Sequence, residues 1–178
     1  ASLDSYQKVI ALSPNFPNAY STMLFPLNYH PDLGADEIFA AYRAYDANVG
    51  LPLRAAWRAH DNDRNVTRRL RVGYVSPDFY EHAVRFFLEP LLAHHDRAAV
   101  EVFAYAELSK EDSTTATYKR YVDRWTPTVG LSDDAFAERI WLDKIDILVD
   151  LAGHTAKNRL GVFARKPAPV SISWMGYG

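Results

Sequence analysis

The stretch DKIDILVDLAGHT, residues 143–155, is the most informative part of the chain for its fold. Its centre, residues 145–151, is apolar except for Asp146 and Asp150, which is typical of a strand covered on both faces. A small polar loop follows at once, beginning with Ala152 and Gly153. The stretch therefore predicts a buried strand of a parallel sheet with a polar loop at its carboxyl end.

Strands and helices alternate on both sides of this stretch. Further strands are predicted at residues 70–75, 100–106, around Trp125 and at 170–174. The segments between them have helical patterns, at residues 84–95, 114–122, 132–142 and 158–164. This alternation predicts an α/β fold, a Rossmann-like parallel sheet with helices on both faces. Because ligands bind at the carboxyl ends of such strands, the loops of interest are 76–84, 152–159 and 176–178.

Two local signals refine the helices of this region. Ser132 precedes two acidic residues and is the predicted N-cap of its helix. The helix at 84–95 is predicted to turn one apolar face to the sheet, formed by Phe87, Leu88, Leu91 and Leu92.

The first part of the chain is helical instead. Apolar residues at helical spacing predict helices at 3–12, 15–29 and 36–49, the last ended by Gly50 and Pro52. The polar stretch 59–69 lacks periodicity and indicates a linker. We therefore expect a small all-α segment (1–58), a linker (59–69) and an α/β lobe (70–178). The first residues lack the regions of a signal peptide, and we expect a fragment that starts within a helix.

Composition excludes several classes of protein. With 20 Lys and Arg against 22 Asp and Glu, the net charge of -2 argues against a dedicated nucleic-acid binder. The absence of cysteine excludes disulfides, thiolate metal sites and a cysteine nucleophile. No apolar run reaches the roughly 18 residues that a membrane span requires. No histidines have the i, i+4 spacing of a metal-binding helix, and no Gly-x-Ser-x-Gly elbow occurs, so we predict neither a metal site nor a serine hydrolase.

The loop after the first strand contains an acid and an imidazole. Asp78 and His82 lie four residues apart at a strand end, a spacing that suits a base and the group that orients it. The alternative is that Asp78 caps the next helix and His82 is an ordinary surface histidine. Spacing alone leaves both interpretations open.

The loop at 152–159 is small, polar and basic. Its donors suit a sugar, a phosphate or a peptide backbone, although it lacks the glycine spacing of a phosphate-binding loop. A loop that leads into a helix and carries solvated charges explains the same residues equally well.

Two long runs, residues 69–96 and 143–178, resemble the protein O-GlcNAc transferase and SPINDLY family in motif and order. Tyr6, Val9, Ile10 and Pro14 also look like the last helix of a tetratricopeptide repeat. The resemblance implies repeats followed by a two-lobed GT-B glycosyltransferase, of which residues 70–178 form the amino-terminal lobe. Such enzymes are inverting, need no metal, and move a sugar from UDP-GlcNAc or GDP-fucose to Ser or Thr of intracellular proteins.

The resemblance also implies roles for individual residues. The family motif SPDFxxHP stands here with Asp78 and His82, which implies that both lie at the active site, as a base or as part of a proton relay. Ala83 replaces the usual proline, Arg85 stands where small residues are usual, and Tyr20 stands where many members have histidine.

Further positions follow from the same comparison of motifs. His154, Thr155 and Arg159 match a motif that would line the acceptor side of the cleft. Met175 and Gly176 match a run that approaches the donor sugar. With Ala83 and Val84, which follow His82, these residues complete the expected substrate and donor side of the site.

We therefore expect part of a cytoplasmic protein O-glycosyltransferase that binds polypeptide acceptors and needs no cofactor beyond its nucleotide-sugar substrate. The isolated chain should be inactive, because the family grips the diphosphate mainly with a second lobe, and its edge near residues 170–178 should favour self-association. Two alternatives remain: a repeat-linked binding module without chemistry, and a GT-B enzyme that acts on another acceptor.

Overall fold

The computed structural model describes residues 3–175. Its centre is a five-stranded sheet in the order β3-β2-β1-β4-β5, in which every neighbouring pair is parallel. The predicted α/β class and parallel sheet are thereby confirmed. The strands are β1 (Leu70–Ser76), β2 (Val100–Ala106), β3 (Arg124–Pro127), β4 (Ile147–Asp150) and β5 (Val170–Ser173).

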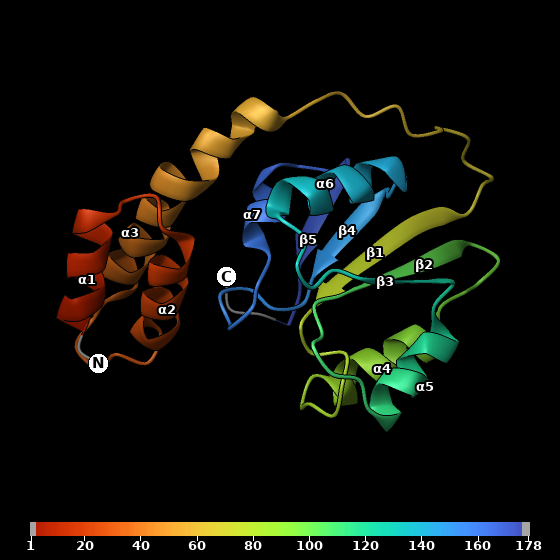
Figure 1. Ribbon diagram of the computed structural model, residues 1–178, viewed down its shortest axis with the longest axis horizontal. Coiled ribbons are helices and arrows are strands. Elements are labelled where there is room, and N and C mark those ends of the chain that lie inside the picture. The colour runs from red at the N-terminus through yellow and green to blue at the C-terminus, as the bar shows by residue number, and fades with distance from the viewer. Residues whose placement is uncertain (1–2, 176–178) are drawn as a thin grey trace.

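Helices cover both faces of the sheet, as Figure 1 shows. On one face lie α4 (Arg85–Ala93) and α5 (Ser113–Tyr121), and on the other lie α6 (Asp133–Leu142) and α7 (Leu160–Ala164). Ser132 caps α6 as predicted, since its hydroxyl accepts a hydrogen bond from the Ala135 amide at 3.2 Å. A helix therefore forms the crossover connection between each pair of consecutive strands.

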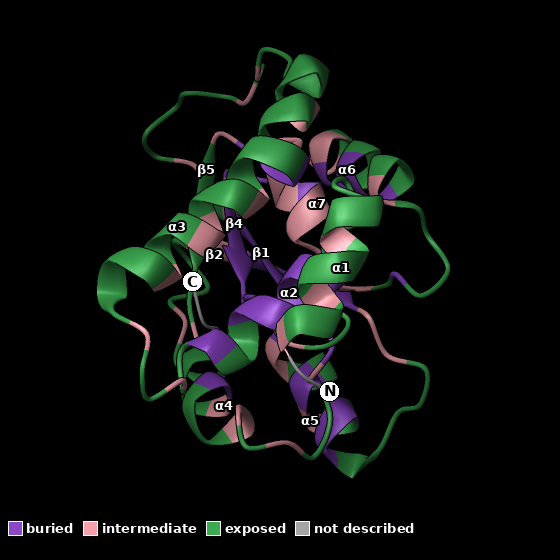
Figure 2. Ribbon diagram, turned by 90° about the vertical axis from the view of Figure 1, so that its left-hand side faces the viewer, coloured by how far each residue is buried: buried purple, intermediate pink, exposed green. Residues whose placement is uncertain are grey.

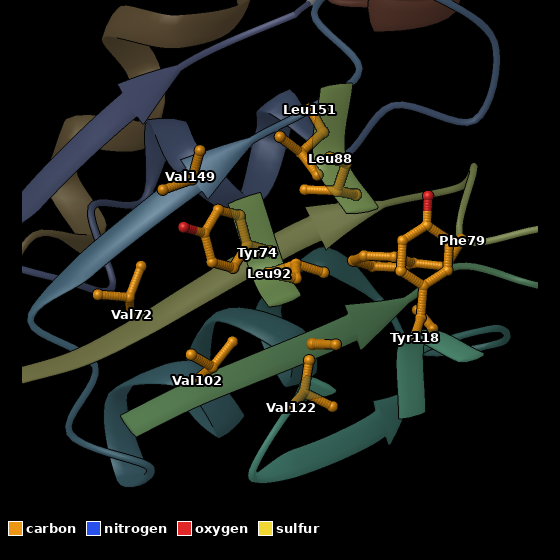
Figure 3. Close-up of a cluster of buried hydrophobic side chains, with 12 residues drawn as sticks. Val72, Tyr74, Phe79, Leu88, Leu92, Val102, Tyr118, Val122, Val149 and Leu151 are labelled. Carbon is orange, nitrogen blue, oxygen red and sulfur yellow. The ribbon is translucent and has the colours of Figure 1, made fainter. Parts of the chain in front are cut away.

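Two hydrophobic cores follow from the alternation of side chains along β1. Val72 and Tyr74 point to the face covered by α4 and α5, where they join the cluster drawn in Figure 3. Val75 points to the other face and packs in the cluster beneath α6 and α7. Gly73 lies between Val72 and Tyr74 in β1 and allows the Tyr105 ring to lie close to the β1 backbone, because a Cβ at Gly73 would be only 2.9 Å from that ring.

The predicted apolar face of α4 is wrong in part. Leu88 and Leu92 are fully buried against the sheet, but the Phe87 side chain is 62% exposed and Leu91 lies at the border of exposure. A nine-residue helix packed flat on a sheet buries one narrow stripe, and residues four apart share that stripe.

Three helices precede the sheet: α1 (Leu3–Leu12), α2 (Pro17–Leu27) and α3 (Ala35–Tyr45). They pack around a separate small core centred on Tyr20 and Leu24. Only α2 contributes fully buried residues over several turns, and Figure 2 shows it between its neighbours and the sheet.

The third helix does not end where the sequence predicted. After α3 the chain continues as a π-helical turn (Asp46–Gly50) and a 3-10 helix (Leu51–Ala56). Gly50 and Pro52 therefore do not terminate the coil. Pro52 lies in the first turn of the 3-10 helix, where an absent amide hydrogen costs nothing because that donor has no partner within the helix.

Residues 57–69 contain neither helix nor strand, yet they are fastened to the α/β lobe. The Trp57 indole donates to the Ala164 carbonyl at 2.7 Å. The Arg68 guanidinium makes two 2.7 Å hydrogen bonds to the Asp146 carboxylate, to which Asn62 also donates. Such paired contacts fix the path of this segment along the lobe. Within residues 3–175 no helix combines the length and the apolar character that crossing a bilayer requires.

Candidate functional site

The loops after β1 and β4 lie at the same edge of the sheet. The two strands are paired in register, with Val75 opposite Asp150 near their carboxyl ends. The chain therefore leaves the sheet at two neighbouring points. The loop after β1 carries Asp78 and His82, and the loop after β4 carries His154. This edge is where doubly wound sheets bind their ligands.

The first loop brings Asp78 and His82 together. A carboxylate oxygen of Asp78 lies 4.0 Å from Nδ1 of His82, a distance suited to an ion pair but too long for a hydrogen bond. The Asp78 side chain is largely buried, whereas the His82 side chain is 38% exposed. Burial raises the pKa of Asp78, while the positive charges of His82 and Lys157 act to lower it. An open imidazole beside a half-buried carboxylate can accept a proton and be oriented by the acid.

The backbone of this loop is held rigidly. The Phe79 ring is fully buried, with its centroid 5.5 Å from that of Tyr118 and 5.3 Å from that of Trp125. The Thr115 hydroxyl donates to the Phe79 carbonyl at 2.7 Å, and the Asp78 amide donates to the Ser76 hydroxyl at 2.9 Å. A buried anchor directly beside Asp78 gives the pair a fixed position before any ligand binds.

The substitutions that set this loop apart from the family motif have simple structural consequences. Ala83 is exposed, and Val84 packs against the core beneath α4. The Val84 amide donates weakly to Nδ1 of His82, at 3.3 Å. Arg85 forms ion pairs with Glu81 and, at 3.4 Å, with Glu89. The Arg85 charge is thus directed to neighbouring acids rather than to His82.

The second loop is organised by a carboxylate that the sequence analysis did not single out. Asp150 is 1% exposed and accepts hydrogen bonds from the amides of Ala152 and Gly153 and from the Ser173 hydroxyl, at 3.1, 2.8 and 3.0 Å. Burial raises its pKa, and these donors act to lower it. The signal was an acidic residue at the end of an apolar strand, followed by a glycine that here has a φ of 54°.

His154 is enclosed by residues of the helical segment. It is 7% exposed, and its Nδ1 lies 3.0 Å from the Ser21 hydroxyl of α2. The rings of Tyr42 and Tyr45 meet it edge-on, with centroids 5.4 and 4.8 Å away. Burial lowers the pKa of His154 to about 4, so the imidazole is neutral at pH 7. His154 therefore joins the helical segment to the α/β lobe.

The other predicted residues of this side are also engaged within the fold. The Thr155 hydroxyl donates to the Ala152 carbonyl at 2.8 Å. Arg159 contacts the Leu131 carbonyl at 2.7 Å and forms ion pairs with Glu107 and Asp133, at 3.3 and 3.0 Å. Their assignment to the acceptor side stays a prediction. Met175 has a φ of 74°, and Gly176 lies outside the described residues.

Two cavities flank the second loop. The first has a volume of about 600 Å³ and is lined by Asn18, Ser21, Thr22, Phe25, His154, Thr155, Ala156, Lys157 and Asn158. The second, of about 460 Å³, is lined by Asp78 together with Pro77, Tyr80, Glu107, Leu108, Ser109, Lys110, Glu111, Asp112, Ala156 and Lys157. Ala156 and Lys157 line both cavities, so they form the ridge between them.

Helix α2 and Lys157 contribute to the site, although neither is among the residues predicted from the sequence. Nothing in the pattern of α2 indicates that its polar residues face a loop more than 130 positions later. Lys157 could have been found, because it is a basic residue in a loop that was already of interest. In the described part of the chain, no group of three or more His, Cys, Asp or Glu side chains could hold a metal ion.

Comparisons with known proteins match this geometry to one family. A family model described as Glycosyl transferase family 41 matches residues 14–178. The chain is 36% identical over 179 residues to a "Probable UDP-N-acetylglucosamine--peptide N-acetylglucosaminyltransferase SPINDLY" of Oryza sativa subsp. japonica, covering 98% of this chain and 19% of that protein. It is 40% identical over 114 residues to the "UDP-N-acetylglucosamine--peptide N-acetylglucosaminyltransferase" of Caenorhabditis elegans, covering 62% and 10%.

A solved structure is similar over nearly the whole chain. It is a mutant O-GlcNAc transferase of Thermobaculum terrenum, with a TM-score of 0.88 and 32% sequence identity, covering 97% of this chain and 33% of that one. The chain thus spans about a fifth of the length of the SPINDLY relative from rice and a third of the bacterial transferase chain.

Proposed function

Since this chain belongs to glycosyl transferase family 41, we propose that it is part of an inverting protein O-glycosyltransferase. The enzyme moves a sugar, GlcNAc or fucose, from a nucleotide-sugar donor to the hydroxyl of Ser or Thr in a polypeptide. The names of the relatives support a peptide acceptor and UDP-N-acetylglucosamine as the donor. GDP-fucose is the second donor that the resemblance to SPINDLY proteins suggests.

The observation that carries this proposal is the pair Asp78 and His82 at the open end of β1. In an inverting transfer, the acceptor hydroxyl attacks the anomeric carbon while the bond to the nucleotide diphosphate breaks. The hydroxyl proton passes to Nε2 or Nδ1 of His82, directly or through one water molecule. Asp78 stabilises the imidazolium that forms, because its carboxylate lies 4.0 Å from Nδ1, within the range of an ion pair.

The two sides of the site have different substrates in this proposal. Ala83, Val84 and Met175, with Gly176, lie on the donor side, and the loop with His154, Thr155 and Arg159 lies on the acceptor side. His154 and Arg159 act there by holding the loop in place, since both are occupied by contacts within the fold. From the resemblance to the family we propose that the transfer uses no metal ion, so other groups of the complete enzyme stabilise the departing diphosphate.

The chain organisation is proposed with the function. Residues 1–58 are the end of a tetratricopeptide-repeat segment, residues 59–69 a linker, and residues 70–178 the amino-terminal catalytic lobe of a cytoplasmic enzyme. Acceptor proteins are held by the repeats and by the cleft.

The isolated chain self-associates through β5, whose Val170 and Ile172 side chains are 47% and 46% exposed at the sheet edge. Light scattering at increasing concentration measures this, and a strictly monomeric species contradicts it.

The experiment that tests the function is sugar transfer by the complete gene product. The protein is incubated with serine- and threonine-containing peptides and with UDP-GlcNAc or GDP-fucose in separate reactions, and mass spectrometry detects the added sugar. We expect modification with one donor. Transfer to neither peptides nor co-expressed proteins, from either donor, contradicts the proposed function. The isolated 178-residue chain should release no calorimetric heat with either nucleotide sugar, and saturable binding of one would show that this lobe alone forms a donor site.

A further inference from the structure

Lys157 occupies an unusual place between the two cavities. It is exposed and lines both of them, together with Ala156. Its backbone has a φ of 60°, a left-handed conformation that lysine adopts rarely and that costs free energy. Among residues 3–175, no hydrogen bond or ion pair occupies its ammonium group, in contrast to Arg159 two positions later. A strained loop therefore presents a cation without a hydrogen bond or ion pair at the ridge between the two cavities.

The first cavity is suited to a polypeptide segment. Its walls carry amide and hydroxyl side chains, namely Asn18, Asn158, Ser21, Thr22 and Thr155, interspersed with apolar surface. Such groups pair with the amides and carbonyls of an extended backbone. Its floor is firmly built, because the Asn158 amide donates to the Ser21 hydroxyl at 3.3 Å beside the contact of Ser21 with His154.

The two cavities differ in charge. Among residues 3–175, no carboxylate lines the first cavity, and His154 is neutral there, so Lys157 gives the described lining a formal charge of +1. The second cavity is lined by Asp78, Glu107, Glu111 and Asp112 against only Lys110 and Lys157. An acidic group is attracted to the first cavity and repelled by the second.

From this arrangement we propose that the first cavity is an acceptor subsite in which Lys157 selects polypeptides with an Asp or Glu side chain near the modified residue. The inference rests on the proposed function and adds a preference for acidic acceptors to it. The reacting Ser or Thr lies beside the pair Asp78 and His82, at the second cavity that Asp78 lines, and the chain continues over the ridge into the first. The acidic side chain there pairs with the Lys157 ammonium, which makes no hydrogen bond or ion pair within residues 3–175 and acts on Asp78 through the field of its charge alone.

A nucleoside diphosphate is a weaker candidate for contact with Lys157. Two adjacent phosphate groups need several cations or converging backbone amides. The first cavity offers one lysine, and the second is bordered by four carboxylates. The charges thus favour a single carboxylate on a polypeptide over a diphosphate.

The test compares matched peptides on the complete gene product. Each fluorescent peptide contains one serine, with Asp placed in turn at each flanking position, and its partner peptide has Asn there instead. Anisotropy gives the dissociation constants for wild type, Lys157→Asn and Lys157→Arg. Asparagine removes the charge and tolerates a positive φ, so the loop keeps its path. Arg64→Asn, which removes an exposed cation between the helical segment and the sheet, is the control for net charge.

We expect wild type to bind the Asp peptide about fivefold more tightly than the Asn peptide at one or two positions, the scale of a solvent-accessible ion pair. Lys157→Asn should abolish that preference, Lys157→Arg should retain it, and Arg64→Asn should leave it unchanged. Equal binding of both peptides at every position, or a preference that survives in Lys157→Asn, overturns the proposal. The absence of measurable binding for both peptides also overturns the proposal.

Further readouts separate this proposal from the donor and from the proposed function. If Lys157→Asn weakens UDP or GDP about fivefold and leaves the peptide preference intact, Lys157 serves the donor and the subsite is refuted. If the Lys157-dependent preference is present but no sugar is transferred, the subsite stands and the proposed function fails. If sugar is transferred equally well to peptides with and without acidic residues, the proposed function stands and the subsite is refuted.

Discussion

The loops after β1 and β4 start at paired positions of the same sheet edge, and each carries one histidine, yet the two imidazoles have opposite surroundings. The His82 side chain is 38% exposed, and within residues 3–175 its ring has a weak contact with the Val84 amide, a long contact with Asp78 and a tilted contact with the Tyr80 ring, whose centroid is 5.7 Å away. His154 is 7% exposed and is held by Ser21 between two tyrosine rings. One imidazole is accessible to a reacting group, and the other is part of the packing.

The role of each histidine therefore depends on which other residues the fold places around it. The partners of His82 are local, within four residues. Those of His154 come from α2 and α3, more than 100 residues earlier in the sequence. Four predictions, in order of decreasing effect, test or sharpen this contrast.

The largest expected effect is loss of stability in His154→Ala. The change removes a buried ring, leaves a cavity between Tyr42 and Tyr45, and leaves the Ser21 hydroxyl with one partner fewer. We expect the free energy of unfolding to fall by about 3–4 kcal/mol. Urea unfolding measures it, and His94→Ala, at the exposed end of α4, is the matched control, expected within about 0.5 kcal/mol of wild type. A loss below about 1 kcal/mol would refute the role of His154 as a joint.

His82→Ala should act on transfer rather than on stability. Removal of the proton acceptor should lower the rate of sugar transfer by the complete gene product by ~100-fold or more, about 2.7 kcal/mol in the barrier. The unfolding free energy should change by no more than about 0.5 kcal/mol, because the side chain is partly exposed and weakly bonded. Single-turnover assays with saturating donor and acceptor measure the rate. Turnover close to that of wild type would remove His82 from the mechanism.

Acidification should destabilise the protein through His154 specifically. Because burial lowers its pKa from the usual 6.5 to about 4, the folded state favours the neutral ring, and the unfolded state binds the proton first. The stability is complete above pH 6.5 and is lost as the pH falls towards 4. Between pH 7 and pH 5 the loss is about 2 kcal/mol.

The control for this prediction is His154→Gln, because the glutamine amide binds no proton in that pH range. Asp78 and Asp150 titrate in both proteins, so the difference between wild type and variant isolates His154. A difference in unfolding free energy that stays constant from pH 7 to pH 5 would mean that His154 is protonated as readily in the folded state as in the unfolded state.

The smallest effect is expected for Ser21→Ala. The variant keeps the packing around His154 but removes the hydroxyl at 3.0 Å from Nδ1 and the acceptor of the Asn158 amide. A net loss of about 1 kcal/mol is expected from the lost hydrogen bonds. Thr22→Ala is the matched control, since the Thr22 hydroxyl donates to the Asn18 carbonyl of its own helix and to no other group in the described part of the chain. If the two variants lose the same stability in urea unfolding, the Ser21–His154 contact has no special weight.

The sheet could be predicted from the sequence because its signals are local. The mostly apolar run at residues 145–151, the first strand predicted at 70–75 and the cap at Ser132 each depend on neighbouring residues alone, and the observed strands end within one residue of the predicted ends. The position of Asp78 and His82 at a strand end follows from the same pattern. The exposure of Phe87 could not be predicted, because it depends on how much of α4 the sheet and α5 cover.

The rest of the site depends on contacts distant in sequence. The enclosure of His154 requires knowledge of where α2 and α3 pack, and no periodicity reports that. The continuation of the coil through Gly50 and Pro52 was missed because both residues usually end an α-helix, whereas π-helical and 3-10 turns accommodate them here. The ridge at Lys157 emerges only when the cavities on both sides of the loop are known.

Chemical labelling of the native protein tests the contrast between the two histidines most directly. Diethyl pyrocarbonate acylates neutral imidazole nitrogens, and mass spectrometry of the digested protein locates the label on each histidine. With a pKa near 4, His154 is neutral at pH 7, so only burial can protect it. The account predicts that His82 is labelled at least about tenfold faster than His154, and that urea removes the difference. Labelling of both histidines at the same rate in the native protein would contradict it.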